Sequence, residues 1–272
     1  MRGNVVVISL PSASARRERM SKLLAEHGLT FQFFDAVDGR QPPGQQRAAL
    51  ALPHAGPLFP AELGCALSHI DVWKSIAASA GSGLTLILED DVHLSAGFAA
   101  DWNGIAAADV PDGIYRFETM LASVTLGMQP VWKGRSCAFH PMQSAHGGTA
   151  AYALNAPTAA ALLASCGEMR EAVDIELFHH ARSSIRPPPV YQAYPALAIQ
   201  DMFLPEHLRT AWLGSQIVAR RDQQTGVAAR DEKTNKAINY MRNAGRPLVN
   251  RWRSLQLRSR GMFRRLIPFA TP

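Results

Sequence analysis

The sequence lacks a long apolar run. No segment approaches the roughly 18 consecutive apolar residues that indicate a membrane-spanning helix. The apolar run within residues 4–10 is also too short for the central region of a signal peptide. We therefore expect a protein that works on the cytosolic side of a membrane.

Cysteine is scarce. Cys65, Cys137 and Cys166 are far apart in the chain, are odd in number and form no CxxC pair. This pattern argues against a disulfide framework and against a structural zinc site. We expect three reduced thiols.

Acidic residues are absent from the C-terminal end of the chain. Residues 233–272 contain ten Lys or Arg and no Asp or Glu, while the first 232 residues carry 18 basic and 22 acidic side chains. The overall formal charge of +6 therefore combines a mildly acidic body with a strongly basic end. We predict a main domain over residues 1–230 and a basic extension over residues 231–272.

The body has the composition and pattern of an α/β domain. With 272 residues, 47% of them hydrophobic, the chain can bury a sizeable core. A strand over residues 4–10, a helix within 12–28 and a strand over 31–37 form a βαβ start, which favours a parallel sheet with helices on its faces. The Gln-, Pro- and Gly-rich segment 40–60 predicts a long loop or lid. Further helices are expected at 61–79, 95–108, 156–166 and 171–184, strands and turns over 113–155, and a strand-like segment at 190–200.

Three adjacent carboxylates follow an apolar strand in the stretch "LTLILEDDV", residues 84–92. Glu89, Asp90 and Asp91 thus stand at the carboxyl end of a strand, where open α/β sheets bind their ligands. Three neighbouring carboxylates repel one another unless a cation lies among them. A hard divalent ion such as Mg²⁺ or Mn²⁺ on a substrate phosphate would relieve the repulsion. A solvated acidic turn is the alternative.

Other candidate site residues lie at the starts of two helices and in a glycine pair. Arg16, Arg17 and Arg19 open the first helix, where guanidinium groups suit phosphate oxygens, although a solvated helix face also explains them. Glu62, Cys65 and His69 share one stripe of the helix 61–79, whose other face is apolar. A structural histidine and a packing cysteine are the alternatives there. The glycines of "HGGTAAYAL" indicate close backbone approach to a ligand or a plain turn.

Taken together, these segments resemble glycosyltransferase family 25. The resemblance covers about residues 4–200 and rests on the order and spacing of "VVVISLPSASARRERMSKLL", "FQFFDAVDG", "AELGCALSHIDVWKSI", "LTLILEDDV", "GGTAAYALNAPTAAALL" and "VDIEL". The family includes lipooligosaccharide galactosyltransferases and is similar to collagen galactosyltransferases. One departure is that Ser9-Leu10-Pro11 stands where many relatives resemble "NLD".

The resemblance implies a fold and a set of donor contacts. The fold is a GT-A-type, Rossmann-like mixed sheet flanked by helices, whose acidic motif holds Mn²⁺ (or Mg²⁺) on the diphosphate of a UDP-sugar. The metal ligands would be Glu89 and Asp91, with Asp91 as the principal one. The remaining donor contacts would come from Ser9, Arg16, Arg17, Asp38 and Asp90, with Asp38 near the base or ribose and Asp90 near the ribose.

The resemblance also implies the reaction. Galactose would pass with inversion from the UDP-sugar to a lipooligosaccharide or related glycan, in a β-linkage. Inversion needs a general base for the acceptor hydroxyl. Asp174 in "AVDIELFHH" is the first candidate because it matches a recurring family position, with His69, Glu62 and His146 behind it; an ordinary helix-start role also explains Asp174.

The basic end of the chain predicts an interaction with a membrane surface. As a helix, residues 246–267 gather apolar side chains on one side and arginines on the others, an imperfect amphipathic pattern. Such a helix suits the anionic inner face of the inner membrane, where a lipid-linked acceptor would be met. A tail that binds nucleic acid and a solvated or disordered end are the alternatives.

Two further classes of protein remain as alternatives to the transferase. A phosphoryl-accepting receiver domain also ends a strand in acidic residues, but it is about half as long, and its other signature residues are not evident. A non-catalytic protein that binds nucleotide, nucleic acid or membrane through the basic end would show steep salt dependence. The acidic body gives nucleic-acid binding no support.

Overall fold

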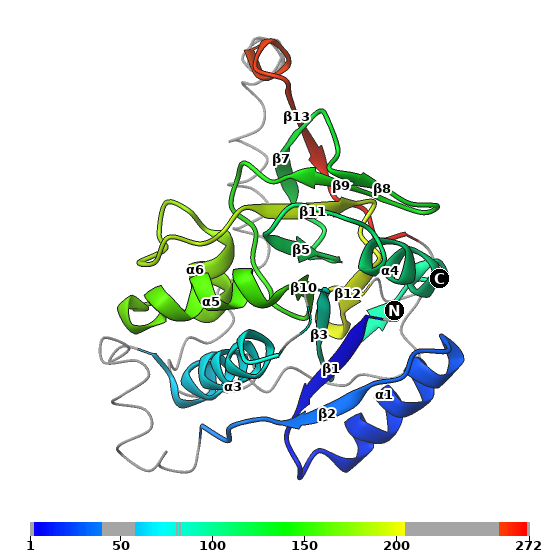
Figure 1. Cartoon of the computed structure of the whole chain (residues 1–272), viewed down its shortest axis with the longest axis vertical. Coiled ribbons are helices and arrows are strands. Elements are labelled where there is room, and N and C mark those ends of the chain that lie inside the picture. Colours follow the sequence, from blue (N-terminus) through cyan, green and yellow to red (C-terminus); the bar gives the residue numbers. More distant parts are fainter. Residues whose placement is uncertain (1–2, 40–57, 80, 82, 205–255, 271–272) are drawn as a thin grey trace, which may run out of the picture.

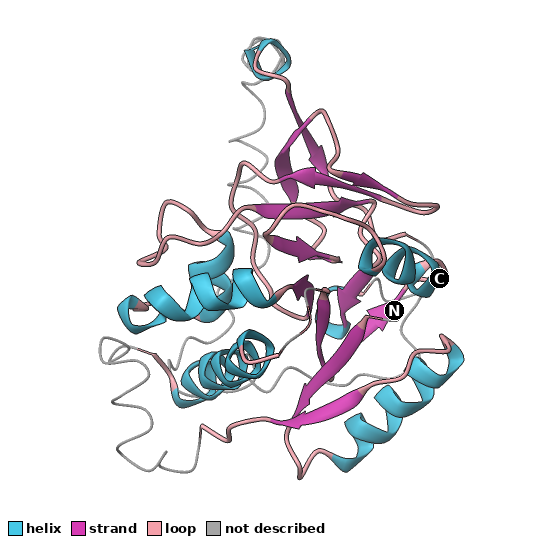
Figure 2. Cartoon of the chain, viewed as in Figure 1, coloured by secondary structure: helices cyan, strands magenta, loops and turns pink. Residues whose placement is uncertain are grey.

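The computed structural model describes residues 3–39, 58–79, 81, 83–204 and 256–270 of the chain. Within these residues the central element is an eight-stranded mixed sheet (Figures 1 and 2). Its strands, in sheet order, are β2 (Gln32–Asp35), β1 (Asn4–Ser9), β3 (Thr85–Glu89), β10 (Ala151–Leu154), β5 (Ile114–Arg116), β11 (Val190–Tyr194), β9 (Ala138–Pro141) and β8 (Trp132–Lys133).

The sheet changes direction at β10. Strands β2, β1 and β3 are parallel, with Ile8 of β1 opposite Glu89 of β3. Strand β10 is antiparallel to both β3 and β5, whereas β5 and β11 are again parallel. Strands β9 and β8 complete the sheet with antiparallel pairs. The predicted βαβ start and mixed sheet are confirmed, and the carboxyl ends of β1 and β3 lie side by side.

Helices cover both faces of the sheet. On one face lie α3 (Pro60–Ala77), α5 (Ala156–Ser165) and α6 (Val173–Phe178), and on the other lie α1 (Ser14–Glu26) and α4 (Phe98–Ala106) (Figure 1). Strand β1 contributes to the core on both faces of the sheet. Val6 and Ile8 enter the core under α3, and Val5 and Val7 enter the core under α1. Side chains alternate across a strand, so one apolar run can join two helical layers.

Several element ends follow from local chemistry. Gly28, at φ +64, follows the end of α1, as glycine commonly does after a helix. Helix α5 begins at Asn155, whose side-chain oxygen accepts the N–H of Thr158 at 3.2 Å. Helix α6 is shorter than the predicted helix at 171–184, because the buried Glu176 carboxylate accepts N–H groups on both sides of it, from Glu171 and Ser184 among others. A loop around that carboxylate replaces the rest of the helix.

Two smaller sheets border the large one. The first joins β4 (Val92–Leu94), β12 (Ala198–Gln200) and β6 (Glu118–Thr119). The second joins β13 (Met262–Leu266) to β7 (Ser123–Gly127) in an antiparallel pair. Short 3₁₀ turns, η1 (Cys166–Glu168) and η2 (Asp201–Phe203), follow α5 and β12. The predicted loop 40–60 lies almost entirely outside the described residues.

The predicted helix over 246–267 is wrong in its last part. Residues 256–259 are helical, but Gly261 at φ +66 turns the chain and residues 262–266 form strand β13. Phe263 packs against the His140 and Tyr194 rings, and Ile267 is fully buried. This tertiary packing outweighs the helical pattern of the sequence. Residues 246–255 lie outside the described residues, and no described helix is long and apolar enough to cross a bilayer.

Candidate functional site

A pocket lies at the carboxyl ends of β1 and β3. Both strands are parallel and adjacent, so the residues that follow them meet at one edge of the sheet. The α3 helix and the segment after β2 form the opposite wall. The pocket is lined by Ile8, Ser9, Leu10, Arg16, Ala36, Val37, Asp38, Gly39, Ala61, Cys65, Ser68, His69, Glu89, Asp90, Asp91 and Gln200.

Asp90 is held by the loop after β1 and by the start of α1. Its Oδ2 accepts the Ser9 hydroxyl at 2.6 Å, and its Oδ1 accepts Arg16 Nη1 at 2.7 Å. The Asp90 side chain is 12% exposed, so this ion pair is largely removed from water. With both oxygens engaged, Asp90 fixes the position of Arg16 at the rim of the pocket.

The other two arginines of α1 brace neighbouring elements. Arg17 donates to the backbone oxygens of Ser9 and Leu10, to the latter at 3.2 Å, and pairs with Asp35 at the end of β2. Arg19 donates to Val92 O at 2.8 Å on β4. Neither Arg17 nor Arg19 lines the pocket, so the structure gives both a bracing position.

Asp38 reaches the pocket through a close contact between two backbone segments. Val37 N donates to Ser68 Oγ at 2.9 Å, and that hydroxyl donates to Gly64 O at 2.6 Å. A Cβ on Gly64 would stand 2.7 Å from Val37 O, so a larger residue would push the segment away. The glycine of "ELGC" thus lets the segment that carries Asp38 pack closely against α3, where Asp38 lines the pocket.

Of the three carboxylates, Asp91 is the one best suited to bind a cation. It is 7% exposed, and within the described residues its Oδ1 is buried without a hydrogen-bond partner. Burial, followed by the nearby charge of Glu89, raises the pKa of Asp91 to about 7. A buried carboxylate oxygen without a donor is a fit ligand for a divalent cation, whose charge would relieve both effects.

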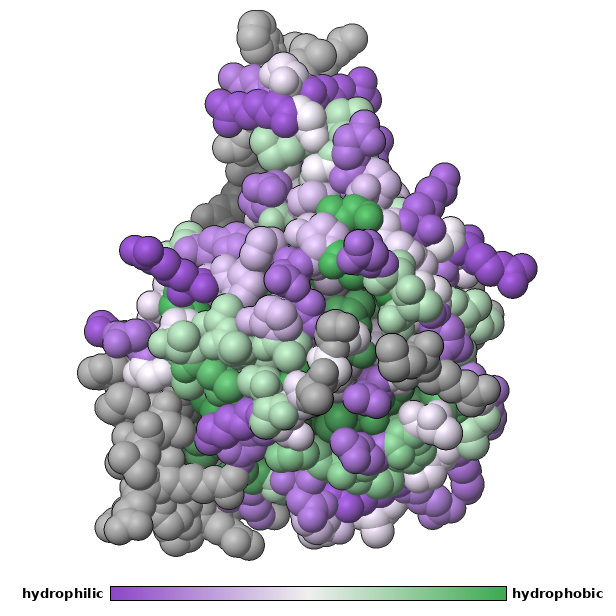
Figure 3. Space-filling view, viewed as in Figure 1, coloured by the Kyte–Doolittle hydropathy of each residue, from purple (hydrophilic) through white to green (hydrophobic). Residues whose placement is uncertain are grey.

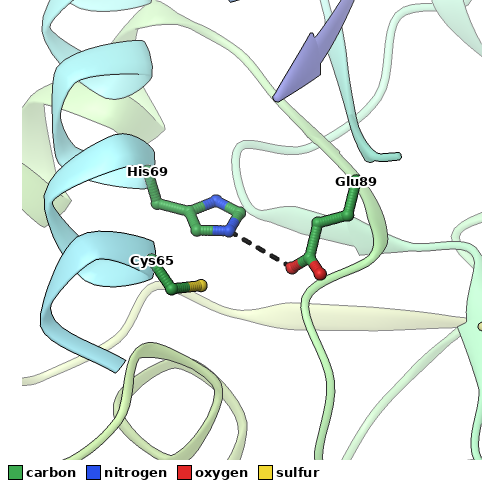
Figure 4. Close-up of side chains that lie close together, drawn as sticks. All are labelled: Cys65, His69 and Glu89. Atoms are coloured by element: carbon green, nitrogen blue, oxygen red, sulfur yellow. Dashed lines mark ion pairs between the residues drawn. The ribbon is translucent and has the colours of Figure 1, made fainter. Parts of the chain in front are cut away.

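Glu89 stands between Asp91 and the α3 helix. Its Oε1 accepts the Thr149 hydroxyl at 2.7 Å and lies 3.4 Å from His69 Nε2 (Figure 4). Burial acts to raise the pKa of Glu89, but His69 and Thr149 together lower it. Glu89 therefore keeps its negative charge and remains available to a cation.

His69 and Cys65 approach Glu89 from the same face of α3 (Figure 4). One ligand atom from each of the three residues lies within 4.8 Å of the others. The predicted stripe is thus confirmed for Cys65 and His69. Glu62 instead accepts the Phe59 N–H at 3.0 Å at the helix start and does not line the pocket.

Asp174 lies beside Gly147 and Gly148, the glycine pair that precedes β10. Its Oδ2 accepts Gly148 N at 3.1 Å, and the next residue along, Thr149, donates to Glu89. The backbone of the "GGT" segment therefore connects Asp174 to the carboxylate edge, by which we mean the edge of the sheet that carries Glu89, Asp90 and Asp91. His146 is 5% exposed, and burial, followed by the charge of Arg116, lowers its pKa to about 3, which keeps the imidazole neutral. The base role of Asp174, His69, Glu62 or His146 stays a prediction.

A buried charge network behind this backbone was missed by the sequence analysis. Arg116 and Glu118 are both fully buried, with Arg116 Nη2 3.4 Å from Glu118 Oε1. Arg116 also donates to Gly147 O and to Gln192 Oε1, the latter at 2.8 Å. Burial raises the pKa of Glu118 to about 8, against the lowering effect of Arg116. The only sequence signal was an Arg and a Glu inside an otherwise apolar strand segment, "IYRFE".

The sequence predictions for the site therefore separate into two groups. Eight predicted residues line the pocket: Ser9, Arg16, Asp38, Cys65, His69, Glu89, Asp90 and Asp91. Five others do not line it and have backbone or ion-pair contacts of their own: Arg17, Arg19, Glu62, His146 and Asp174. The chemical roles of all these residues remain predictions.

Comparisons with known proteins identify related glycosyltransferases. The model of glycosyltransferase family 25 (LPS biosynthesis protein) matches residues 3–177. The lacto-N-neotetraose biosynthesis glycosyltransferase LgtE of Neisseria gonorrhoeae is 31% identical over 232 residues, which cover 80% of this chain and 81% of that protein. LgtB of Neisseria meningitidis serogroup B is 32% identical over 246 residues, covering 84% of this chain and 87% of that protein.

A more distant similarity reaches animal proteins. Procollagen galactosyltransferase 1 of Danio rerio is 35% identical over 103 residues, which cover 35% of this chain and 17% of that protein. The family match, by contrast, spans β1 to α6 and includes the whole carboxylate edge. On this match and on the Neisseria relatives, the chain belongs to glycosyltransferase family 25.

Proposed function

We propose that the protein transfers galactose, with inversion, from UDP-galactose to the glycan of a lipooligosaccharide or related acceptor. The observation that carries the proposal is the pocket at the β1 and β3 ends, where Asp91 offers a buried oxygen that has no hydrogen-bond partner among the residues the structure describes. The arrangement of β2, β1 and β3 with ligand groups at their carboxyl ends is what a GT-A-type fold requires. The names of the Neisseria relatives favour a glycan acceptor.

The residues at the carboxylate edge would bind the sugar donor. Glu89 and Asp91 are the residues that would hold Mn²⁺ or Mg²⁺, which when bound stabilises negative charge on a departing diphosphate. Ser9 and Arg16, tied to Asp90, would meet the nucleotide, with Asp38 on the facing wall. Arg16 is anchored by its 2.7 Å contact with Asp90, so its guanidinium group is already oriented.

The acceptor side needs a base that takes a proton from the attacking hydroxyl. Asp174 is our assignment because its Oδ2 is oriented by Gly148 N and the same backbone segment reaches Glu89 through Thr149. A carboxylate held by backbone donors keeps its geometry during proton transfer. His69 is the second choice because its Nε2 lies beside Glu89 inside the pocket.

Calorimetric titration tests the donor half of the proposal. UDP is titrated into the wild-type protein with Mn²⁺ and with EDTA, and then into Asp91→Ala and into Asp109→Ala, whose side chain is exposed and outside the pocket. We expect metal-dependent binding in the wild type and in Asp109→Ala and its loss in Asp91→Ala. UDP-galactose turnover is then compared with that of other UDP-sugars. Equal UDP binding by Asp91→Ala would overturn the assignment.

We also propose that the basic end of the chain meets an anionic membrane at its inner face. Arg258, Arg260, Arg264 and Arg265 are exposed near Leu266, which is 53% exposed. Figure 3 shows hydrophilic side chains around the end of the molecule that carries β13. The surface is thus a β-ribbon with a helical turn rather than one long helix. Cosedimentation with anionic vesicles, compared with neutral vesicles, tests this; equal binding to both would refute it.

A further inference from the structure

Cys65, His69 and Glu89 converge on one point of the pocket (Figure 4). Cys65 and His69 are four residues apart on α3, so their side chains share one helix face. Glu89 ends β3 and points toward them. One ligand atom from each lies within 4.8 Å of the other two, and His69 Nε2 lies 3.4 Å from Glu89 Oε1. Atoms this close need little movement to share a metal ion.

His69 is oriented as a metal ligand is. Its Nδ1 lies 2.7 Å from Tyr152 Oη, and that oxygen accepts Trp73 Nε1–H at 2.8 Å. The imidazole is fully buried, and within the described residues its Nε2 makes no hydrogen bond of good geometry, only the 3.4 Å contact with Glu89 Oε1. Metal-binding histidines are commonly held in this way, with one ring nitrogen bonded to a neighbour and the other directed at the ion.

The three ligand atoms differ from those of a Mn²⁺ or Mg²⁺ site. They are a sulfur, an imidazole nitrogen and a carboxylate oxygen, which is the ligand set of Zn²⁺. The hard ions Mg²⁺ and Mn²⁺ favour oxygen alone. We propose that Cys65, His69 and Glu89 bind Zn²⁺ through three protein ligands, and that this zinc inhibits the transferase by occupying Glu89.

The charge around the site favours a cation with a thiolate ligand. Cys65 carries its proton in the metal-free protein, since burial, followed by the charges of Glu89, Asp174 and Asp91, raises the pKa of the thiol. Binding of Zn²⁺ therefore forms one Zn–S bond and releases one proton to solvent. The same three carboxylates that disfavour a bare thiolate attract the dication. All three zinc ligands line the pocket, so a fourth position stays open to water.

The inhibitory part of the inference rests on the proposed function. Glu89 is shared, because it is also assigned to the ion that accompanies the donor. A zinc ion held toward α3 by Cys65 and His69 would draw the Glu89 carboxylate away from Asp91. Zinc and Mn²⁺ would then compete for one carboxylate rather than for one complete site.

Cobalt provides a spectroscopic test of the zinc site. Co²⁺ substitutes for Zn²⁺ and gives a thiolate-to-metal charge-transfer band when sulfur is a ligand. We titrate Co²⁺ and then Zn²⁺ into the wild type, Cys65→Ser and Cys166→Ser, in which the replaced cysteine lies outside the pocket. The wild type and Cys166→Ser should show the band, and Zn²⁺ should displace it. A band that is absent in the wild type, or retained in Cys65→Ser, overturns the proposal.

A second variant separates ligand loss from misfolding. Tyr152→Phe keeps all three ligands and removes the hydroxyl that bonds both His69 Nδ1 and Trp73 Nε1. The cobalt band should persist, while zinc affinity should fall by about 10-fold or more, as for other partners of metal-binding histidines. Unchanged zinc affinity in a folded Tyr152→Phe would contradict the orienting role that supports the site. Circular dichroism of each variant verifies folding.

Failure of the zinc site and failure of the proposed function give different results. Asp91→Ala should lose Mn²⁺-dependent UDP binding but keep the cobalt band, because Asp91 is not a zinc ligand. A band without any UDP binding would support the zinc site and refute the donor assignment. Zinc should weaken Mn²⁺-dependent UDP binding in the wild type and in Cys166→Ser but not in Cys65→Ser. Zinc that binds without this effect would refute the inhibitory role.

Discussion

Replacement of Arg116 by Met tests the buried network behind the site. Arg116 Nη1 donates to Gln192 Oε1 at 2.8 Å and to Glu118 O at 3.1 Å, and Nη2 bonds Gly147 O. Methionine fills much of the same space but cannot make these three hydrogen bonds, although Glu118 O keeps its bond from Gln192 Nε2 at 3.0 Å. It also leaves the Glu118 carboxylate fully buried without its counter-charge.

The expected loss of stability follows from the lost hydrogen bonds and, at a pH above about 8 where Glu118 is ionised, from that uncompensated charge. Removal of one partner of a buried ion pair typically costs about 3–5 kcal/mol. The matched control is Arg182→Met, because Arg182 pairs with Glu171 at 2.9 Å but is 52% exposed, and exposed pairs contribute about 0–1 kcal/mol. Both substitutions remove a guanidinium group, so the difference between their losses of unfolding free energy measures the effect of burial.

The pH dependence adds a second expectation. The pKa of Glu118 is already raised to about 8, chiefly by burial, and Arg116 acts to lower it. A carboxyl whose folded pKa is raised binds more protons in the folded state, so its contribution to stability falls as pH rises above the unfolded pKa, about 4.3. Without Arg116 this fall should steepen and extend to higher pH. The defect of Arg116→Met should therefore be larger at pH 8 than at pH 5.

Urea unfolding of the variants at several pH values measures these effects. Above pH 8, Arg116→Met/Glu118→Gln should recover more than half of the loss, since the double variant buries no lone charge. A loss in Arg116→Met no greater than in Arg182→Met would refute the reasoning. A loss that does not change with pH would refute the part assigned to Glu118.

Three further predictions concern the neighbouring elements. Gly148→Ala should destabilise the fold and reduce transferase turnover, because Gly148 has φ +88 and a Cβ would stand 2.9 Å from Glu118 Oε2; unchanged melting and turnover would contradict this. Asn155→Ala should cost about 1 kcal/mol in urea unfolding through loss of the α5 cap to Thr158, and no change would disprove the cap's contribution. In metal-free protein, Asp91 with its pKa of about 7 should make stability fall from about pH 4 to pH 7, and saturating Mn²⁺ should flatten that slope; the same slope with and without Mn²⁺ would count against the ligand assignment.

Local sequence signals predicted the elements that hold the site. The run Asn4–Ser9 is β-branched and apolar on both faces, as a central parallel strand must be, and the structure has β1 there. The arrival of Glu89 at a strand end follows from the apolar run before it. Both signals depend on residues within one element, so the sequence contains them in full.

The contacts within the site join residues that are far apart in the sequence, so local sequence signals could not predict them. Nothing near Arg16 in the sequence says that it bonds Asp90, which is 74 residues away, rather than a ligand. Arg116 and Gln192 meet because β5 and β11 are neighbours, and strand order was not predictable from periodicity. The helix prediction at the C-terminus failed for the same reason, since β13 exists through its pairing with β7.

The balance of charge supports our proposal that this edge of the sheet selects among cations. Arg16 offsets Asp90 directly, so the uncompensated negative charge rests on Glu89 and Asp91. On one side of Glu89 lies Asp91, an oxygen ligand suited to a hard ion. On the other side lie a thiol and an imidazole, suited to a soft one. Because one carboxylate would serve both proposed sites, our proposals imply that the ion bound by Glu89 determines whether the edge can hold a diphosphate.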